Sequence, residues 1–167
     1  MNFDDEFSHE TPETGSDELL SDDNLRLPDS ASTLVRIHAI RAWLKRRRQE
    51  AAIEVGEAAL AIQHTAQEDP QHRPRRREIQ SNMERVQRAQ RTFAEAQQRL
   101  DAYDEAETLL EDCVAHTTSG ERVLVEYYLT LEELVQDITD EIAHSPRYQA
   151  LADVQHRVEH VGAPNED

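Results

Sequence analysis

The chain has 167 residues, a formal net charge of −17 and only 37% hydrophobic residues. Its length suffices for one domain with its own core, while few apolar residues argue against a β-sandwich or a doubly wound sheet. One cysteine excludes an intrachain disulfide framework, and no apolar stretch approaches the roughly 18 residues of a membrane span. We therefore expect a cytoplasmic protein with no membrane segment.

The charge is unevenly distributed along the chain. Residues 1–35 carry ten acids and one arginine, residues 36–91 carry thirteen bases and seven acids, and residues 92–167 carry eighteen acids and four arginines. Lys45 is the only lysine among the eighteen basic residues. This usage resembles the proteomes of salt-loving archaea, where acidity keeps proteins soluble, although a GC-rich genome also favours arginine over lysine. Whether the acidity reflects habitat or function stays open.

The first 28 residues are acidic, lack a helical period and contain Pro12, Gly15 and Pro28. This composition predicts a disordered acidic tail over 1–28. Leucines and phenylalanines scattered among the acids would let such a tail dock on a partner or fold back on its own domain. We expect a helical-bundle domain over 29–162 and a disordered C-terminus over 163–167.

The first helix is predicted to start in the N-cap candidates that follow Pro28 and to run to about Gln67. Gly56 lies in its middle, where glycine costs about 1 kcal/mol relative to alanine and allows either close helix approach or a bend. Residues 68–74 contain two prolines and predict a break.

The second helix is predicted over 75–116, since no proline or glycine interrupts it and apolar residues recur at heptad spacing. Two series form this seam: Ile79, Val86, Phe93, Leu100 and Val114, and Ala89, Ala96, Tyr103 and Leu110. A third apolar helix begins near Ser119, and Ser145-Pro146 predicts the start of a fourth segment that ends at Gly162.

These elements predict an all-α fold: an elongated antiparallel helical bundle or coiled-coil hairpin with a broken third helix. It has three long arms, or four helices if the break separates the third arm. If the hairpin folds symmetrically about Gln71, Arg36 lies level with residue 106, which predicts that Arg36 and Glu107 are neighbours.

Three motifs resemble metal sites, but none is complete. His156 to His160 matches the H-x-x-E-H string of inverted zinc-protease motifs without a further distant ligand. Glu141 and His144 form one E-x-x-H, whereas a di-iron bundle needs two. Cys113 and His116 also lack further ligands. We therefore predict no catalytic residue, no metal, no cofactor and no enzymatic activity.

The basic residues give the sharpest functional signal. They form one cluster over 36–48 and another over 73–91, and Trp43 within the first could stack on a base or lie under a guanidinium group. Tyr127, Tyr128, Leu131 and Leu134 offer apolar surface for self-association. The candidate interaction residues are Arg41, Trp43, Lys45, Arg46, Arg47, Arg48, Arg75, Arg76, Arg77, Tyr127 and Tyr128.

Two functions follow from these surfaces. The first is a non-enzymatic helical-bundle protein that acts by protein–protein contact, as a scaffold, an adaptor or a self-assembling component, whose partner is another protein or a second copy. The alternative is an accessory nucleic-acid-binding protein that uses both arginine clusters. The net charge and the salt sensitivity of phosphate contacts disfavour this alternative. We instead expect the arginines to pair with acids of neighbouring helices or of the N-terminal tail, or to dock an acidic partner.

Overall fold

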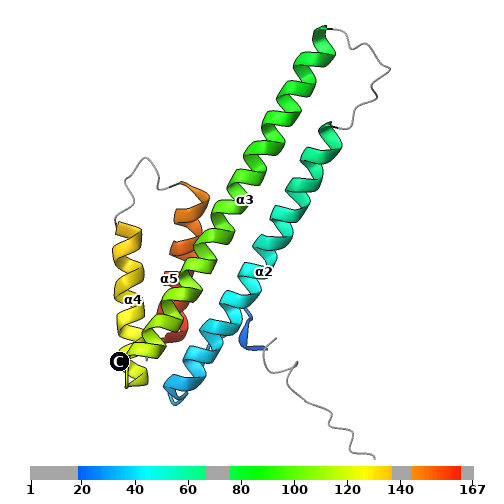
Figure 1. Ribbon diagram of the computed structural model, residues 1–167. Coiled ribbons are helices and arrows are strands. Elements are labelled where there is room, and N and C mark those ends of the chain that lie inside the picture. The colour runs from blue at the N-terminus through cyan, green and yellow to red at the C-terminus, as the bar shows by residue number, and fades with distance from the viewer. Residues whose placement is uncertain (1–18, 67–75, 137–143, 163–167) are drawn as a thin grey trace, which may run out of the picture.

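The protein is a four-helix, all-α bundle over the residues that its computed structural model describes, 19–66, 76–136 and 144–162, with no strand among them (Figure 1). The helices are α2 (Thr33–Ala66), α3 (Arg76–His116), α4 (Gly120–Gln136) and α5 (Pro146–Gly162). The helical-bundle prediction is confirmed. The coiled-coil detail stays a prediction.

Local capping chemistry explains where α2 and α5 begin. The Ser32 hydroxyl accepts a hydrogen bond from the Val35 amide at 3.4 Å, and the Ser145 hydroxyl accepts one from the Tyr148 amide at 3.1 Å. Each serine side chain thus satisfies an amide that the first helical turn leaves without a partner. Pro146 follows as the first residue of α5, a position that needs no amide hydrogen.

The two long helices form an antiparallel hairpin, and α4 and α5 cover only one half of it (Figure 1). Helix α3 contacts α2, α4 and α5. The covered half therefore holds the main core, whereas the far half of the hairpin consists of α2 and α3 alone. The core residues are Ile37, Ala39, Ile40, Trp43, Leu44, Ala51, Ala102, Tyr103, Ala106, Leu110, Val123, Leu124, Tyr127, Leu131, Ala150, Leu151, Val154, Val158 and Val161.

Ion pairs between α2 and α3 define the register of the hairpin. They join Arg41 to Glu111, Arg48 to Asp104 and Glu54 to Arg99, so the residue numbers of each pair add up to 152 or 153. A hairpin that is symmetric about Gln71 would pair residues whose numbers add up to 142. The predicted register is therefore wrong by about ten residues, or about 15 Å along the axis. Side-chain pairing, and not the midpoint of the connection, determines the register.

The predicted proximity of Arg36 and Glu107 fails for the same reason. Glu107 accepts a hydrogen bond from Arg48, which lies about 18 Å further along α2. The Arg36 guanidinium instead donates to the Val161 carbonyl at 2.8 Å and to carbonyls that precede α2.

The heptad seam of α3 is only partly buried. The series from Ala89 to Leu110 is buried, as expected. Ile79, however, is 47% exposed, which contradicts its predicted place in the seam. The register puts the end of α2 level with residues 86–87, so the start of α3 extends beyond α2, as Figure 1 shows.

The acidic tail predicted over 1–28 divides at Leu19. Residues 1–18 lie outside the described residues, as does the predicted C-terminal tail over 163–167. Residues 19–29, which we call the strap, lie against the bundle, with Leu20, Leu25 and Leu27 packed on the core. This end of the segment follows the expected alternative of folding back on its own domain, because its leucines provide apolar surface that the core covers.

Gly56 provides a test of intrinsic helix stability. A Cβ atom built at this position meets no heavy atom within 4 Å, so the predicted close helix approach is wrong. We expect Gly56→Ala to raise the free energy of unfolding by about 1 kcal/mol, because alanine restricts the unfolded chain and favours helix. Urea unfolding followed by circular dichroism measures this, and unchanged or lower stability would contradict it.

Candidate interaction surfaces

The arginines of the first cluster are largely paired with acidic side chains. Arg41 donates two hydrogen bonds to Glu111, at 2.6 and 2.7 Å. Arg48 pairs with Asp104 at 3.2 Å and also with Glu107. Lys45 differs, because it is exposed and makes no ion pair with another described residue. Most of the charge that phosphate groups would need is thus already balanced within the molecule.

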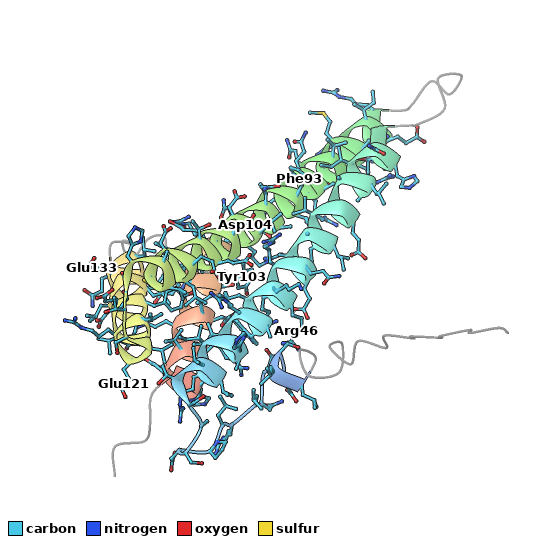
Figure 2. The ribbon with its side chains drawn as sticks, turned by 60° about the horizontal axis from the view of Figure 1, so that its bottom comes forward. Arg46, Phe93, Tyr103, Asp104, Glu121 and Glu133 are labelled. Carbon is cyan, nitrogen blue, oxygen red and sulfur yellow. The ribbon has the colours of Figure 1, made fainter. Side chains whose placement is uncertain are left out.

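Arg46 and Arg47 face the strap. Arg46 lies next to the strap in Figure 2 and donates to Asp23 at 2.5 Å, while Arg47 lies 3.5 Å from the same carboxylate oxygen. Both arginines also pair with Glu50, at 3.6 and 3.3 Å. The acidic N-terminal segment therefore neutralises part of the basic cluster.

Trp43 is a core residue beneath two guanidinium groups, the second of the two expected roles, and not an exposed ring that stacks on a base. It is 3% exposed, and its ring contacts Tyr103 edge to face at a centroid distance of 6.2 Å. Its indole N–H donates to Asp23 at 2.6 Å, and the guanidinium groups of Arg47 and Arg157 lie 5.2 and 5.9 Å from the ring centroid. A nucleobase has no access to this ring while the strap is in place.

Asp23 joins these groups electrostatically. Burial raises the pKa of its carboxyl, but the hydrogen bond from Trp43 and the charges of Arg47 and Arg46 outweigh burial, so the pKa lies below the ordinary 3.8. A lowered pKa in the folded state means that this carboxylate contributes stability above the unfolded-state pKa. The contribution is lost as the pH falls below 3.8, through the lower pKa of the folded state.

Arg157 is a buried binding residue that sequence reasoning missed. It is 4% exposed and donates to the strap carbonyls of Leu20 and Asp23, at 3.1 and 3.4 Å. Burial lowers its pKa. Its position beside Val154, Val158 and Val161 on the buried face of α5 was a usable signal, because a helix buries neighbours three and four residues apart.

The second arginine cluster lies far from the first. Arg75 lies outside the described residues, whereas Arg76 and Arg77 are exposed at the start of α3. The register places the 46–48 segment level with residues 104–106, about 40 Å from Arg76 along the axis. Arg88 and Arg91, at the end of the second cluster that lies nearer the first, line a shallow pocket of about 280 Å³. The two clusters therefore do not combine into one compact patch.

The predicted self-association patch on α4 is wrong in its main members. Tyr127 and Leu131 are fully buried, and the Tyr127 hydroxyl donates to the Ala106 carbonyl at 2.9 Å. Burial also raises the pKa of Tyr127. Tyr128 donates to Glu159 at 2.8 Å and accepts from Gln155 at 3.3 Å. Packing on α3 and α5 uses the apolar stripe of α4 that the sequence suggested was free.

Apolar surface on α4 remains at a neighbouring position, in a groove of about 660 Å³ that we call the base groove. Val125 and Leu129 are 58% and 50% exposed there, one helical turn apart. Three acids, Asp29, Glu121 and Glu159, also line it, and Figure 2 shows Glu121 at the start of α4. The full lining is Asp29, Ala31, Thr33, Arg36, Glu121, Leu124, Val125, Tyr128, Leu129, Val158 and Glu159.

Further apolar side chains are exposed on the hairpin beyond α4 and α5. Ile53 and Leu60 on α2 are 56% and 55% exposed, and Met83 on α3 is 59% exposed. These side chains do not line the base groove, and Glu84, Gln87 and two arginines line the pocket on that part of α3.

The histidine motifs form no metal-binding group in the part of the chain that the structure describes. His156 and His160 are exposed on α5, where their rings lie 4.5 Å apart, and Glu141 lies outside the described residues. Cys113 is half-buried against the core, and burial raises the pKa of its thiol. Within the described ranges, every helix is too short or too polar to cross a membrane.

Comparison with known proteins assigns no relative: no family model, curated protein sequence or solved structure matches the chain. The described fold is an all-α helical bundle, and any function rests on the surfaces above.

Proposed function

We propose that this protein is a non-enzymatic adaptor that acts by protein–protein contact, with the base groove as its binding surface. The observation that carries the proposal is the combination of exposed Val125 and Leu129 with acids along the same groove. Contiguous apolar surface bordered by polar residues is typical of interaction sites. The acids select the partner by charge, and the apolar floor provides affinity.

The partner that fits the base groove is an amphipathic helix with basic residues beside its apolar stripe. Apolar side chains spaced by three or four residues would contact Val125 and Leu129. Arginine or lysine side chains would pair with Glu121, Glu159 and Asp29. A second copy is a poorer fit, because a chain with a net charge of −17 is repelled from an acidic rim.

Nucleic-acid binding is not proposed, because its main residues are engaged elsewhere. Arg41 and the 46–48 segment pair with acids, and Trp43 is buried. The net charge of the chain opposes phosphate binding as well.

A labelled helical peptide of about four turns, with leucines on one face and arginines beside them, tests the proposal. Fluorescence anisotropy measures its binding to the full chain. We expect Val125→Ser with Leu129→Ser to weaken binding at least about tenfold, because this double variant removes apolar contact without changing charge. Both positions are exposed, so the fold should persist.

The chain offers a matched control in Ile53→Ser with Leu60→Ser, which removes two equally exposed apolar residues outside the base groove. This variant should bind like the wild type, and a peptide with glutamates in place of its arginines should bind far more weakly. Equal losses in both double variants, or equal binding of the two peptides, would overturn the proposal.

A further inference from the structure

The strap occupies a defined cationic and aromatic surface, formed by Trp43, Arg46 and Arg47 of α2 with Arg157 of α5, which we call the strap site. The Asp23 carboxylate accepts from the Trp43 indole and from Arg46, and it faces Arg47. Arg157 binds the strap backbone at the Leu20 and Asp23 carbonyls. Side chains of α2 and α5 therefore bind one carboxylate and two backbone carbonyls of the strap.

The strap does not satisfy all the donors of this surface. The Nε atoms of Arg46, Arg47 and Arg157 are buried without a hydrogen-bond partner. Arg157 is 4% exposed, so water does not readily replace the missing acceptor. Buried donors without an acceptor are rare and unfavourable in native proteins. A ligand that brings one more carboxylate would satisfy donors that the strap leaves unpaired.

The ionic contacts of the strap with this surface are partly exposed, while Arg36 fixes its C-terminal end through the Pro28 and Asp29 carbonyls. Leu19 is 73% exposed, and the side chains of Asp23 and Arg46 are 47% and 32% exposed. Ion pairs with such exposure contribute modestly, whereas the hydrogen bond from the buried Trp43 indole to the charged Asp23 carboxylate is of the stronger, charge-assisted kind. Docking of the strap therefore rests on its leucines, on the two carbonyls bound by Arg157 and on the Asp23 carboxylate that accepts from the buried Trp43 indole.

We propose that the strap site binds an acidic, leucine-containing segment of a partner protein, and that the strap is its internal competitor. The strap shows the chemistry that the site accepts: an aspartate between leucines, with backbone carbonyls towards Arg157. A partner segment with additional carboxylates displaces the strap because it also satisfies the Nε donors. This proposal does not depend on the base groove, which shares none of these four side chains.

Asp23→Asn in the full chain tests the competition. It removes the charge facing Arg46 and Arg47 while leaving the leucines in place. The probe is a labelled peptide with the sequence of residues 19–27. We expect Asp23→Asn to bind this probe at least about tenfold more tightly than the wild type, because the internal competitor is weakened. Anisotropy measures binding, and circular dichroism confirms that the variant is folded.

Asp22→Asn is the matched control, because Asp22 accepts from the Asn24 amide and forms no ion pair with Arg46 or Arg47, and its charge acts on Arg157 less than that of Asp23 does. It should bind the probe as the wild type does. A probe with asparagine at both aspartate positions should not bind either protein. Emission from Trp43, the only tryptophan, reports independently on the strap and should shift to longer wavelength in Asp23→Asn.

Three results would overturn the proposal. The first is equal binding of the probe to the wild type and Asp23→Asn, and the second is equal binding of the asparagine probe. The third is no binding to Asp23→Asn although Trp43 emission shows that the strap has opened. Binding of the arginine-bearing peptide to the base groove is measured separately, so failure of one proposal can be distinguished from failure of the other.

Discussion

Replacing Trp43 with alanine is expected to lower the free energy of unfolding by about 4 kcal/mol. The substitution removes a large side chain that is 3% exposed, together with its edge-to-face contact with Tyr103. It also leaves the Asp23 carboxylate without the indole donor. Urea unfolding followed by circular dichroism measures the change, because the variant lacks the tryptophan that fluorescence would use.

Two further variants, Trp43→Phe and Leu60→Ala, serve as a conservative replacement and an exposed-site control for this experiment. Phenylalanine keeps most of the ring packing but not the hydrogen bond to Asp23, so we expect a smaller loss of about 1–2 kcal/mol. Leu60 is on the same helix but 55% exposed, so its truncation should cost about 0.5 kcal/mol. If Trp43→Ala cost no more than Leu60→Ala, the indole would not belong to the core.

Replacing Arg36 with alanine should cost about 3 kcal/mol of stability, although arginine is usually a surface residue. This side chain is 5% exposed, and its guanidinium donates to the carbonyls of Pro28, Asp29, Ala31 and Val161. It thereby joins the segment before α2 to the end of α5. Truncation leaves buried carbonyls without donors, and Arg36→Lys should restore only part of the loss, since an ammonium lacks the planar fork.

Arg41→Ala is the matched control for Arg36. It removes an arginine from the same helix whose carboxylate partner, Glu111, is half exposed, so the cost should stay within about 1 kcal/mol. Urea unfolding compares the two variants, and hydrogen exchange over residues 29–36 locates the effect. Equal costs for Arg36→Ala and Arg41→Ala would contradict a structural role for the buried guanidinium.

Sequence patterns predicted the helices well where local chemistry determines their ends. Ser32 and Ser145 are N-caps, so α2 and α5 begin within a few residues of prediction. The seam from Ala89 to Leu110 was predicted because heptad spacing reflects burial directly. N-caps and heptad spacing are local features, because the residues that form them lie close together in the sequence.

The same sequence patterns could not predict contacts between residues that are far apart in the chain. The register depends on contacts such as Arg48 with Asp104, and the assumption of a symmetric connection misplaced it. The strap could not be placed, because Leu20 is held by Arg157, 137 residues away in the chain. The same symmetric connection placed Arg36 beside Glu107, whereas its guanidinium is buried among backbone carbonyls, a position that hydrophobic periodicity does not suggest for arginine.

Of the candidate interaction residues, the sequence predicted the arginine cluster around Trp43 and favoured its pairing with acids, as the ion pairs of Arg46 and Arg48 have it. Acidic composition at the N-terminus and basic composition over 36–91 were visible, yet only the structure shows that Asp23 joins them. The base groove was missed for a geometric reason. Val125 and Leu129 lie beside the stripe of α4 that packs on α3 and α5, and which flank stays exposed depends on the neighbouring helices.

Hydrogen exchange of the full chain, with and without the arginine-bearing peptide, tests most directly whether the base groove is the binding surface. We predict that the peptide slows exchange in α4 around Val125 and Leu129 and in the last turns of α5 near Val158. Protection confined to residues 41–48 or 76–91 would contradict this and assign binding to the arginine clusters instead.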